Sequence, residues 1–193
     1  MGPEAVIEGL LEAMGKLAET NNTYKKGHHR KVATLAKAIA GELGLSADSA
    51  SGIWAAGNIH DIGEILVPID ILCKATKLTH IESMLLKEHP LNGYDILKEI
   101  YFPWPVAETV LQHHERTDGS GYPRGLRGDA IGQEARVLAV ADVAVAMLSD
   151  RPYRYAMAFE KALLELTKGM AGALDIDAVG ACVTLLSEKG FGF

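Results

Sequence analysis

Cysteine is scarce in this 193-residue sequence, where only Cys73 and Cys182 occur and no CxxC pair is formed. A disulfide framework and a metal site built on clustered thiolates are therefore excluded. A reduced chain in the cytoplasm is the expectation. No apolar run approaches the ~18 residues that a membrane-spanning helix needs. No basic segment followed by an apolar one opens the chain, so neither a membrane span nor a signal peptide is expected.

An excess of positive charge is also missing. The chain has 19 Lys and Arg against 25 Asp and Glu, a formal net charge of -6. Proteins that bind nucleic acids generally need clustered Lys and Arg to neutralise the phosphate backbone, so no nucleic-acid partner is expected. A local basic pocket for a small phosphorylated ligand remains compatible with this balance.

Alternating strand patterns are nearly absent, and the hydrophobic periodicity is helical along most of the chain. With 48% hydrophobic residues, a chain of this length can bury a substantial core. We expect an all-α domain of seven to nine helices. Residues 1–19 are expected to form an N-terminal helix or the end of a linker, and residues 20–193 the domain itself.

Local signals predict several helix boundaries. Gly44 should stop the second helix, Ser46 should cap the third, and Thr79 with Glu82 has the spacing of a capping box. Pro90 predicts a break after the preceding residue, because proline lacks an amide donor. Further helices are expected at residues 103–115, 131–148, 158–166 and 177–185.

One stretch departs from the helical pattern. The sequence ERTDGSGYPRGLRGD, from Glu115 to Asp129, is rich in glycine and contains a proline, which predicts a loop. Long loops in compact domains are often functional. We favour a functional loop over a flexible connection because Tyr122, Arg124 and Arg127 lie in it.

Imidazoles and carboxylates recur on otherwise apolar helices, where an unpaired carboxylate would be costly to bury. Each could have a hydrogen-bonded structural role, but together they supply nitrogen and oxygen ligands for two metal ions. An aspartate beside a histidine can bridge two ions while the imidazole binds one. Two close ions can hold a hydroxide and neutralise charge on a phosphoryl group. The residues are His28, His60, Asp61, His89, His113, His114 and Asp142.

The motifs that contain these residues resemble the HD-GYP family of the HD phosphohydrolase superfamily. They are GHHRKVATLAKAIA from Gly27, HDIG from His60, HHERTDGSGYPRGL from His113, ARVLAVADV from Ala135 and SDRPYR from Ser149. The resemblance covers roughly residues 20–185.

The resemblance implies hydrolysis of the bacterial second messenger cyclic di-GMP to pGpG, sometimes onward to GMP, by a hydroxide held between two divalent metals. Iron or manganese is the expected metal, with zinc or nickel as alternatives. The resemblance assigns His60 and Asp61 to catalysis. It makes Asp61 the bridging ligand and assigns all seven residues named above to the metals. It also assigns Tyr122, Arg151 and Arg154 to the substrate, and suggests that diguanylate cyclase (GGDEF) domains contact the loop.

Two positions depart from the family pattern. Glu64 stands where most members have a lysine near the metals and the substrate phosphate, which reverses the charge beside a dianionic ligand. Glu64 could weaken substrate binding, bind a metal, pair with an arginine or turn to solvent. Tyr24 stands where members with three metals have an acidic ligand, so two metals are expected. His29 matches no family ligand and is expected to be solvated or structural.

Three functions are therefore carried forward. The first is a cyclic di-GMP phosphodiesterase. The second is a catalytically weak or inactive signalling module, silenced by Glu64, that binds a ligand or partner protein. The third is a hydrolase of a different cyclic dinucleotide or nucleotide.

Overall fold

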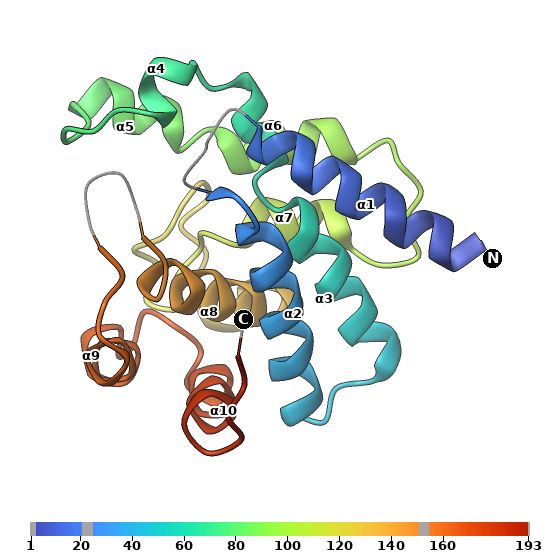
Figure 1. The fold of residues 1–193 in the computed structure, drawn as a ribbon. Coiled ribbons are helices and arrows are strands. Elements are labelled where there is room, and N and C mark those ends of the chain that lie inside the picture. Colours follow the sequence, from blue (N-terminus) through green and yellow to red (C-terminus); the bar gives the residue numbers. More distant parts are fainter. Residues whose placement is uncertain (1–2, 21–24, 151–154, 193) are drawn as a thin grey trace.

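The computed structural model describes residues 3–20, 25–150 and 155–192, and within these ranges every regular element is a helix (Figure 1). Apart from the single turn α4, nine α-helices are present in these ranges, which confirms the predicted all-α fold. The α-helices are α1 (Pro3–Glu19), α2 (His28–Glu42), α3 (Ala47–Ile59), α4 (Ile69–Leu72), α5 (His80–Leu86), α6 (His89–Leu97), α7 (Val106–Gln112), α8 (Gln133–Met147), α9 (Phe159–Leu164) and α10 (Ile176–Ser187). Short 3-10 helices η2 (Ile62–Leu66) and η3 (Gly128–Ala130) and a π-helical turn η4 (Glu165–Gly169) complete them.

The predicted capping sites are confirmed, whereas the helix expected at residues 103–115 is shorter and covers Val106–Gln112. The Ser46 hydroxyl accepts a hydrogen bond from the Ser49 amide, and Thr79 and Glu82 form a reciprocal capping box. Gly44 follows α2 with a left-handed φ of 71°. Pro90 lies in the first turn of α6, which begins at His89, so the break falls just before His89 rather than just after it. Within the described residues, no helix is both long and apolar enough to cross a membrane.

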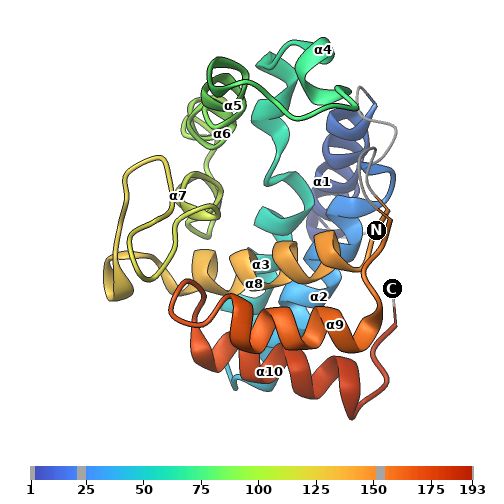
Figure 2. The same cartoon turned by 90° about the vertical axis from the view of Figure 1, so that its left-hand side faces the viewer.

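Helices α2, α3 and α8 form the centre of the molecule. In both views α4 and α5 lie at one end and α9 and α10 at the other (Figures 1 and 2). Helix α2 packs against both α3 and α8, and its side chains Leu35 and Ile39 are fully buried. The site described below lies where the ends of α2, α3, α6 and α7 meet the middle of α8.

Two glycines allow the close packing that brings these elements together. A Cβ on Gly57 of α3 would lie 2.7 Å from the Cα of Ala33 in α2. A Cβ on Gly63 of η2 would overlap the carbonyl oxygen of His89. Larger residues at these positions would therefore push α3 from α2 and η2 from α6.

Helix α1 contributes to the start of α2. Gly27, the residue before α2, has no side chain with which to cap the helix. The Glu19 carboxylate at the end of α1 accepts hydrogen bonds from the amides of Gly27 and His29, at 2.7 and 2.9 Å. A carboxylate at a helix N-terminus is favourable because it satisfies free amides and opposes the helix dipole. The division between residues 1–19 and 20–193 stays a prediction.

Candidate metal centre

The seven predicted metal ligands lie together in the interior. They come from the first residues of α2 and α6, the two residues after α3, the two residues after α7, and the middle of α8. Their ligand atoms form two groups without a shared residue, and within each group the atoms lie within 4.8 Å of one another. Asp61 with His89, His113 and His114 is the first group, and His28 with His60 and Asp142 is the second.

Backbone carbonyls fix the orientation of the histidines. The Nδ1 atoms of His60, His89 and His113 lie 2.8, 2.8 and 2.6 Å from carbonyl oxygens three residues earlier in the chain. A carbonyl can only accept, so each Nδ1 must be the donor. The Nε2 atom is then left with a lone pair when the imidazole is neutral. Metal-binding histidines are commonly held in this way.

The Nε2 atoms converge on Asp61 from two sides. Oδ1 of Asp61 lies 3.2 Å from His89 Nε2 and 3.7 Å from His113 Nε2. Oδ2 lies 3.1 Å from His60 Nε2. The two oxygens of this carboxylate therefore face different sets of imidazoles.

Several of these contacts place one acceptor against another. His89 Nε2 and His113 Nε2 are 3.4 Å apart, although each ring already donates through Nδ1. The Nε2 atom of His60 is buried without a hydrogen-bond partner. Buried acceptors that face one another are costly unless a proton or a cation lies between them. The donor set therefore fits divalent cations.

The electrostatics keep this site ready for metal at neutral pH. Burial lowers the pKa of His28 and His113 to about 4, and it also lowers the pKa of His114. Burial alone would raise the pKa of Asp61, but His60 and Lys25 hold it well below its usual range. Neutral imidazoles and ionised carboxylates are the forms that bind metals.

His60 behaves differently from these imidazoles. Burial alone would lower its pKa, but the adjacent Asp61 carboxylate outweighs that effect, and the pKa is raised. Without a metal, a proton on His60 supplies part of the positive charge that Asp61 requires.

Sequence reasoning missed Lys25, which lies just before α2. Its ammonium contacts Asp61 Oδ2 at 2.5 Å and Glu64 Oε1 at 2.7 Å, and both Lys25 and Glu64 are buried. Glu64 therefore does not turn to solvent, and its ion-pair partner among the described residues is a lysine rather than an arginine. The charge reversal at position 64 is accompanied by a lysine from another segment. No local pattern signals this pair, because its members are 39 residues apart.

Of the two expectations for His29, solvated or structural, the structure rules out the first. His29 is 2% exposed rather than solvated, and its Nδ1 lies 3.1 Å from the carbonyl oxygen of Gly15 in α1. Its Nε2 has no hydrogen-bond partner and lies 3.5 Å from Asp61 Oδ2. His29, His60 and Asp61 form a third group of potential ligands. The adjacent pair His28–His29 at the start of a helix was the available signal.

The predicted loop borders the metal centre. The Tyr122 ring lies 4.8 Å from the His114 ring, and the ammonium of Lys87 lies 5.2 Å from the centre of the Tyr122 ring. The buried Glu115 carboxylate accepts hydrogen bonds from the amides of Arg124 and Leu126, at 2.7 and 3.0 Å. Glu115 therefore holds the loop against the end of α7. Tyr24, Arg151 and Arg154 lie outside the described residues.

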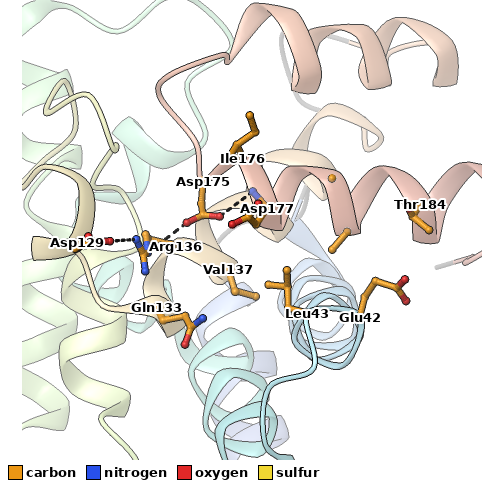
Figure 3. Close-up of a pocket in the computed structure, with 12 residues that line it drawn as sticks. Glu42, Leu43, Asp129, Gln133, Arg136, Val137, Asp175, Ile176, Asp177 and Thr184 are labelled. Atoms are coloured by element: carbon orange, nitrogen blue, oxygen red, sulfur yellow. Dashed lines mark hydrogen bonds and ion pairs between the residues drawn. The ribbon is translucent and has the colours of Figure 1, made fainter.

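A separate hollow of about 720 Å³ lies between α2, α8 and α10 (Figure 3). Of its twelve lining residues, four carry carboxylates and one, Arg136, carries a positive charge. Arg136 is already paired with Asp129 at 2.8 Å and Asp175 at 3.4 Å. Such an anionic hollow repels a dianionic ligand, and its lining contains no histidine. The metal centre is therefore the better candidate site.

Two curated relatives are similar in sequence to most of this chain. A 3'3'-cGAMP-specific phosphodiesterase of Vibrio cholerae is 36% identical over 163 residues, 84% of this chain and 38% of that protein. A cyclic di-GMP phosphodiesterase response regulator of Xanthomonas campestris is 44% identical over 138 residues, 70% of this chain and 36% of that protein. The chain thus spans well under half the length of these curated relatives.

A solved structure has a similar fold, and a family of known sequences matches most of the chain. Bd1817, described as an HDG"Y"P protein from Bdellovibrio bacteriovorus, matches with a TM-score of 0.74 at 20% identity, over 93% of this chain and 63% of that one. The sequence pattern of the HD domain family matches residues 12–178. This match, the curated relatives and the motifs quoted above agree, and the chain belongs to the HD-GYP family of HD-domain proteins.

Proposed function

We propose that this domain is a metal-dependent phosphodiesterase that hydrolyses cyclic di-GMP to pGpG. One observation carries the proposal: the two oxygens of Asp61 face two different sets of imidazole Nε2 atoms. A carboxylate placed in this way can bridge two metal ions. The names of the relatives support a cyclic dinucleotide as the substrate.

Two divalent ions are proposed, iron or manganese in the first place and zinc or nickel as alternatives. Nitrogen and oxygen ligands without thiolate suit these metals. When bound, such ions lower the pKa of water to give a nucleophile near neutral pH, and they neutralise charge on phosphoryl oxygens. One ion would be held by His28, His60, Asp61 and Asp142, and the other by Asp61, His89, His113 and His114.

The remaining side chains would position the substrate. Tyr122 borders the His89–His114 side of the centre, and its ring is proposed to contact a base or ribose. Burial raises the pKa of its hydroxyl, so Tyr122 can donate a hydrogen bond throughout the working pH range. Arg151 and Arg154 are proposed to contact the phosphates, as the family motif implies. The loop from Glu115 to Asp129 is also proposed to contact diguanylate cyclase domains.

The substrate assay separates these possibilities. Purified protein is loaded anaerobically with Fe²⁺ or Mn²⁺ and incubated with cyclic di-GMP or 3'3'-cGAMP, and the products are separated by chromatography. We expect pGpG from cyclic di-GMP. Asp61→Asn should lower turnover by more than about 100-fold because it removes a bridging ligand. Faster turnover of 3'3'-cGAMP would replace the proposed substrate.

Asp177→Asn is the matched control, because Asp177 is exposed on α10 and remote from the centre. It should leave turnover unchanged. The proposal fails if the metal-loaded protein gives no linear product from either substrate, or if Asp61→Asn retains activity.

The second candidate, a binding module without turnover, is favoured by the additional buried carboxylate of Glu64. Lys25 argues against this second candidate, because its ammonium compensates the negative charge of Glu64. Glu64→Lys alone would place two ammonium groups together, so Lys25→Leu/Glu64→Lys is the better variant. If the wild type binds cyclic di-GMP without hydrolysis and this variant hydrolyses it, the second candidate is correct.

A further inference from the structure

We propose that the ammonium of Lys25 occupies a third cation position in the metal centre, so that this chain binds two metal ions where its side chains would otherwise bind three. The proposal concerns the metal centre of the proposed phosphodiesterase. It is tested by counting ions, whether or not the protein hydrolyses any substrate.

The side chains around Asp61 form three groups of potential ligands rather than two. The two groups described first share no residue, so each can hold an ion at the same time. The third group, His29 with His60 and Asp61, shares two members with the others. His29 is therefore the only member that belongs to the third group alone.

His29 is built as a ligand would be. Its Nδ1 can only donate to the carbonyl of Gly15, which leaves a lone pair on Nε2 when the ring is neutral. That Nε2 atom is buried without a hydrogen-bond partner among the described residues and lies 3.5 Å from Asp61 Oδ2. A solvated or merely structural histidine gains nothing from an unpartnered buried nitrogen.

Lys25 supplies the cation on this side of Asp61. Its ammonium lies 2.5 Å from Asp61 Oδ2, the oxygen that His29 faces. It also lies 2.7 Å from Glu64 Oε1. Because two carboxylates share one ammonium in a buried site, the position is one where positive charge is strongly favoured.

Removing the ammonium should therefore recruit a divalent ion. Without Lys25, the buried Glu64 carboxylate would be left without its ion partner, and His29 would add a nitrogen ligand on the same side of Asp61. The donor set of carboxylate oxygens and imidazole nitrogen suits Mn²⁺ and Fe²⁺.

The experiment counts Mn²⁺ per chain by equilibrium dialysis followed by elemental analysis. The wild type should bind two ions. Lys25→Leu, which removes the charge and introduces no ligand, should bind three. Lys25→Arg, which keeps the charge, should remain at two. Lys25→Leu/His29→Asn should return to two, because asparagine can still reach the Gly15 carbonyl but has no atom in place of Nε2.

Circular dichroism and thermal unfolding show whether each variant folds. If Lys25→Leu does not, Lys25→Met, whose thioether does not suit Mn²⁺, takes its place with the same expected count. Three ions in the wild type, two in the charge-removing variant, or three in the double variant would each overturn the proposal. A protein that binds ions as expected but hydrolyses nothing would overturn only the proposed function.

Discussion

Individual side chains in the metal centre are held by contacts that leave one atom of each free for a ligand. Backbone carbonyls engage Nδ1 of His60, His89 and His113, and Nε2 is directed at the carboxylates. Asp142 is also held by one of its two oxygens, because its Oδ1 lies 3.1 Å from His28 Nε2. Burial alone would raise the pKa of Asp142, but the bond to His28 holds it well below its usual range. The site is therefore ordered before any ion binds.

The buried imidazoles predict that the metal-free protein is sensitive to acid. The pKa values of His28 and His113 are lowered from the usual 6.5 to about 4. Below pH 6.5 the unfolded chain therefore takes up protons that the folded chain does not. Stability falls as the pH drops from about 6.5 to 4, by up to about 3 kcal/mol for each imidazole. The pKa of His114 is also lowered, so it adds to this trend. Of the four histidines with shifted pKa values, only His60, whose pKa is raised, opposes the trend.

Urea unfolding of the metal-free protein at several pH values measures this effect. His28→Asn should reduce the loss of stability between pH 6.5 and 4. His80→Asn, at an exposed position at the start of α5, is the control and should leave the loss unchanged. A free energy of unfolding that stays constant or rises over this range would contradict the prediction.

Among the elements, η2 packs so closely against its neighbour α6 that one of its positions has no room for a side chain. This 3-10 helix follows directly after His60 and Asp61, and it packs against α6, whose first residue is His89. Gly63 is the point of closest approach, because any Cβ there meets the backbone of α6. The glycine of the HDIG motif thus sets the distance between two sets of ligands.

Gly63→Ala should therefore destabilise the fold and weaken metal binding together. Relief of the overlap requires η2 and α6 to separate, at a cost of about 1–3 kcal/mol. Denaturant unfolding and Mn²⁺ titration measure the two effects. Gly41→Ala is the matched control, because a Cβ on Gly41 in α2 meets nothing within 4 Å. It should be neutral, or stabilising by up to about 1 kcal/mol. Equal behaviour of the two variants would disprove the role given to Gly63.

On the scale of the whole molecule, the metal centre joins elements that are far apart in the sequence. Its proposed ligands come from α2, the end of α3, α6, the end of α7 and α8, and the last of these helices lies in the centre of the fold (Figures 1 and 2). Bound ions would therefore cross-link the ends of several helices in the folded state. An ion that binds only the folded chain stabilises it by mass action.

Metal loading should raise the melting temperature. Free Mn²⁺ at 100 times its dissociation constant contributes about 2.7 kcal/mol, or roughly 5–10 °C for a domain of this size. Differential scanning calorimetry with Mn²⁺ and with a chelator measures the shift. Asp61→Asn should lose most of the shift, whereas Asp177→Asn should keep it. A melting temperature that is the same with metal and with chelator would contradict this expectation.

The fold was largely predictable from local signals. Helical periodicity, the capping residues Ser46 and Thr79 and the break at Pro90 act over a few residues, and the structure contains all of them. The short helices η2 and η4 were not predicted. Segments of 3-10 and π-helix are short departures from α-helical geometry, and η2 adopts its shape where it packs against α6.

The sequence alone determined the helical class, because short-range spacing is enough to specify it, and its motifs predicted which residues make up the candidate metal centre. Only the tertiary structure decided that Glu64 pairs with Lys25 and that His29 turns inward to Asp61. The partners in these contacts lie 39 and 32 residues apart, so no periodicity relates them. They meet because α1, α2 and η2 pack around one buried carboxylate, whose charge must be balanced where water is excluded.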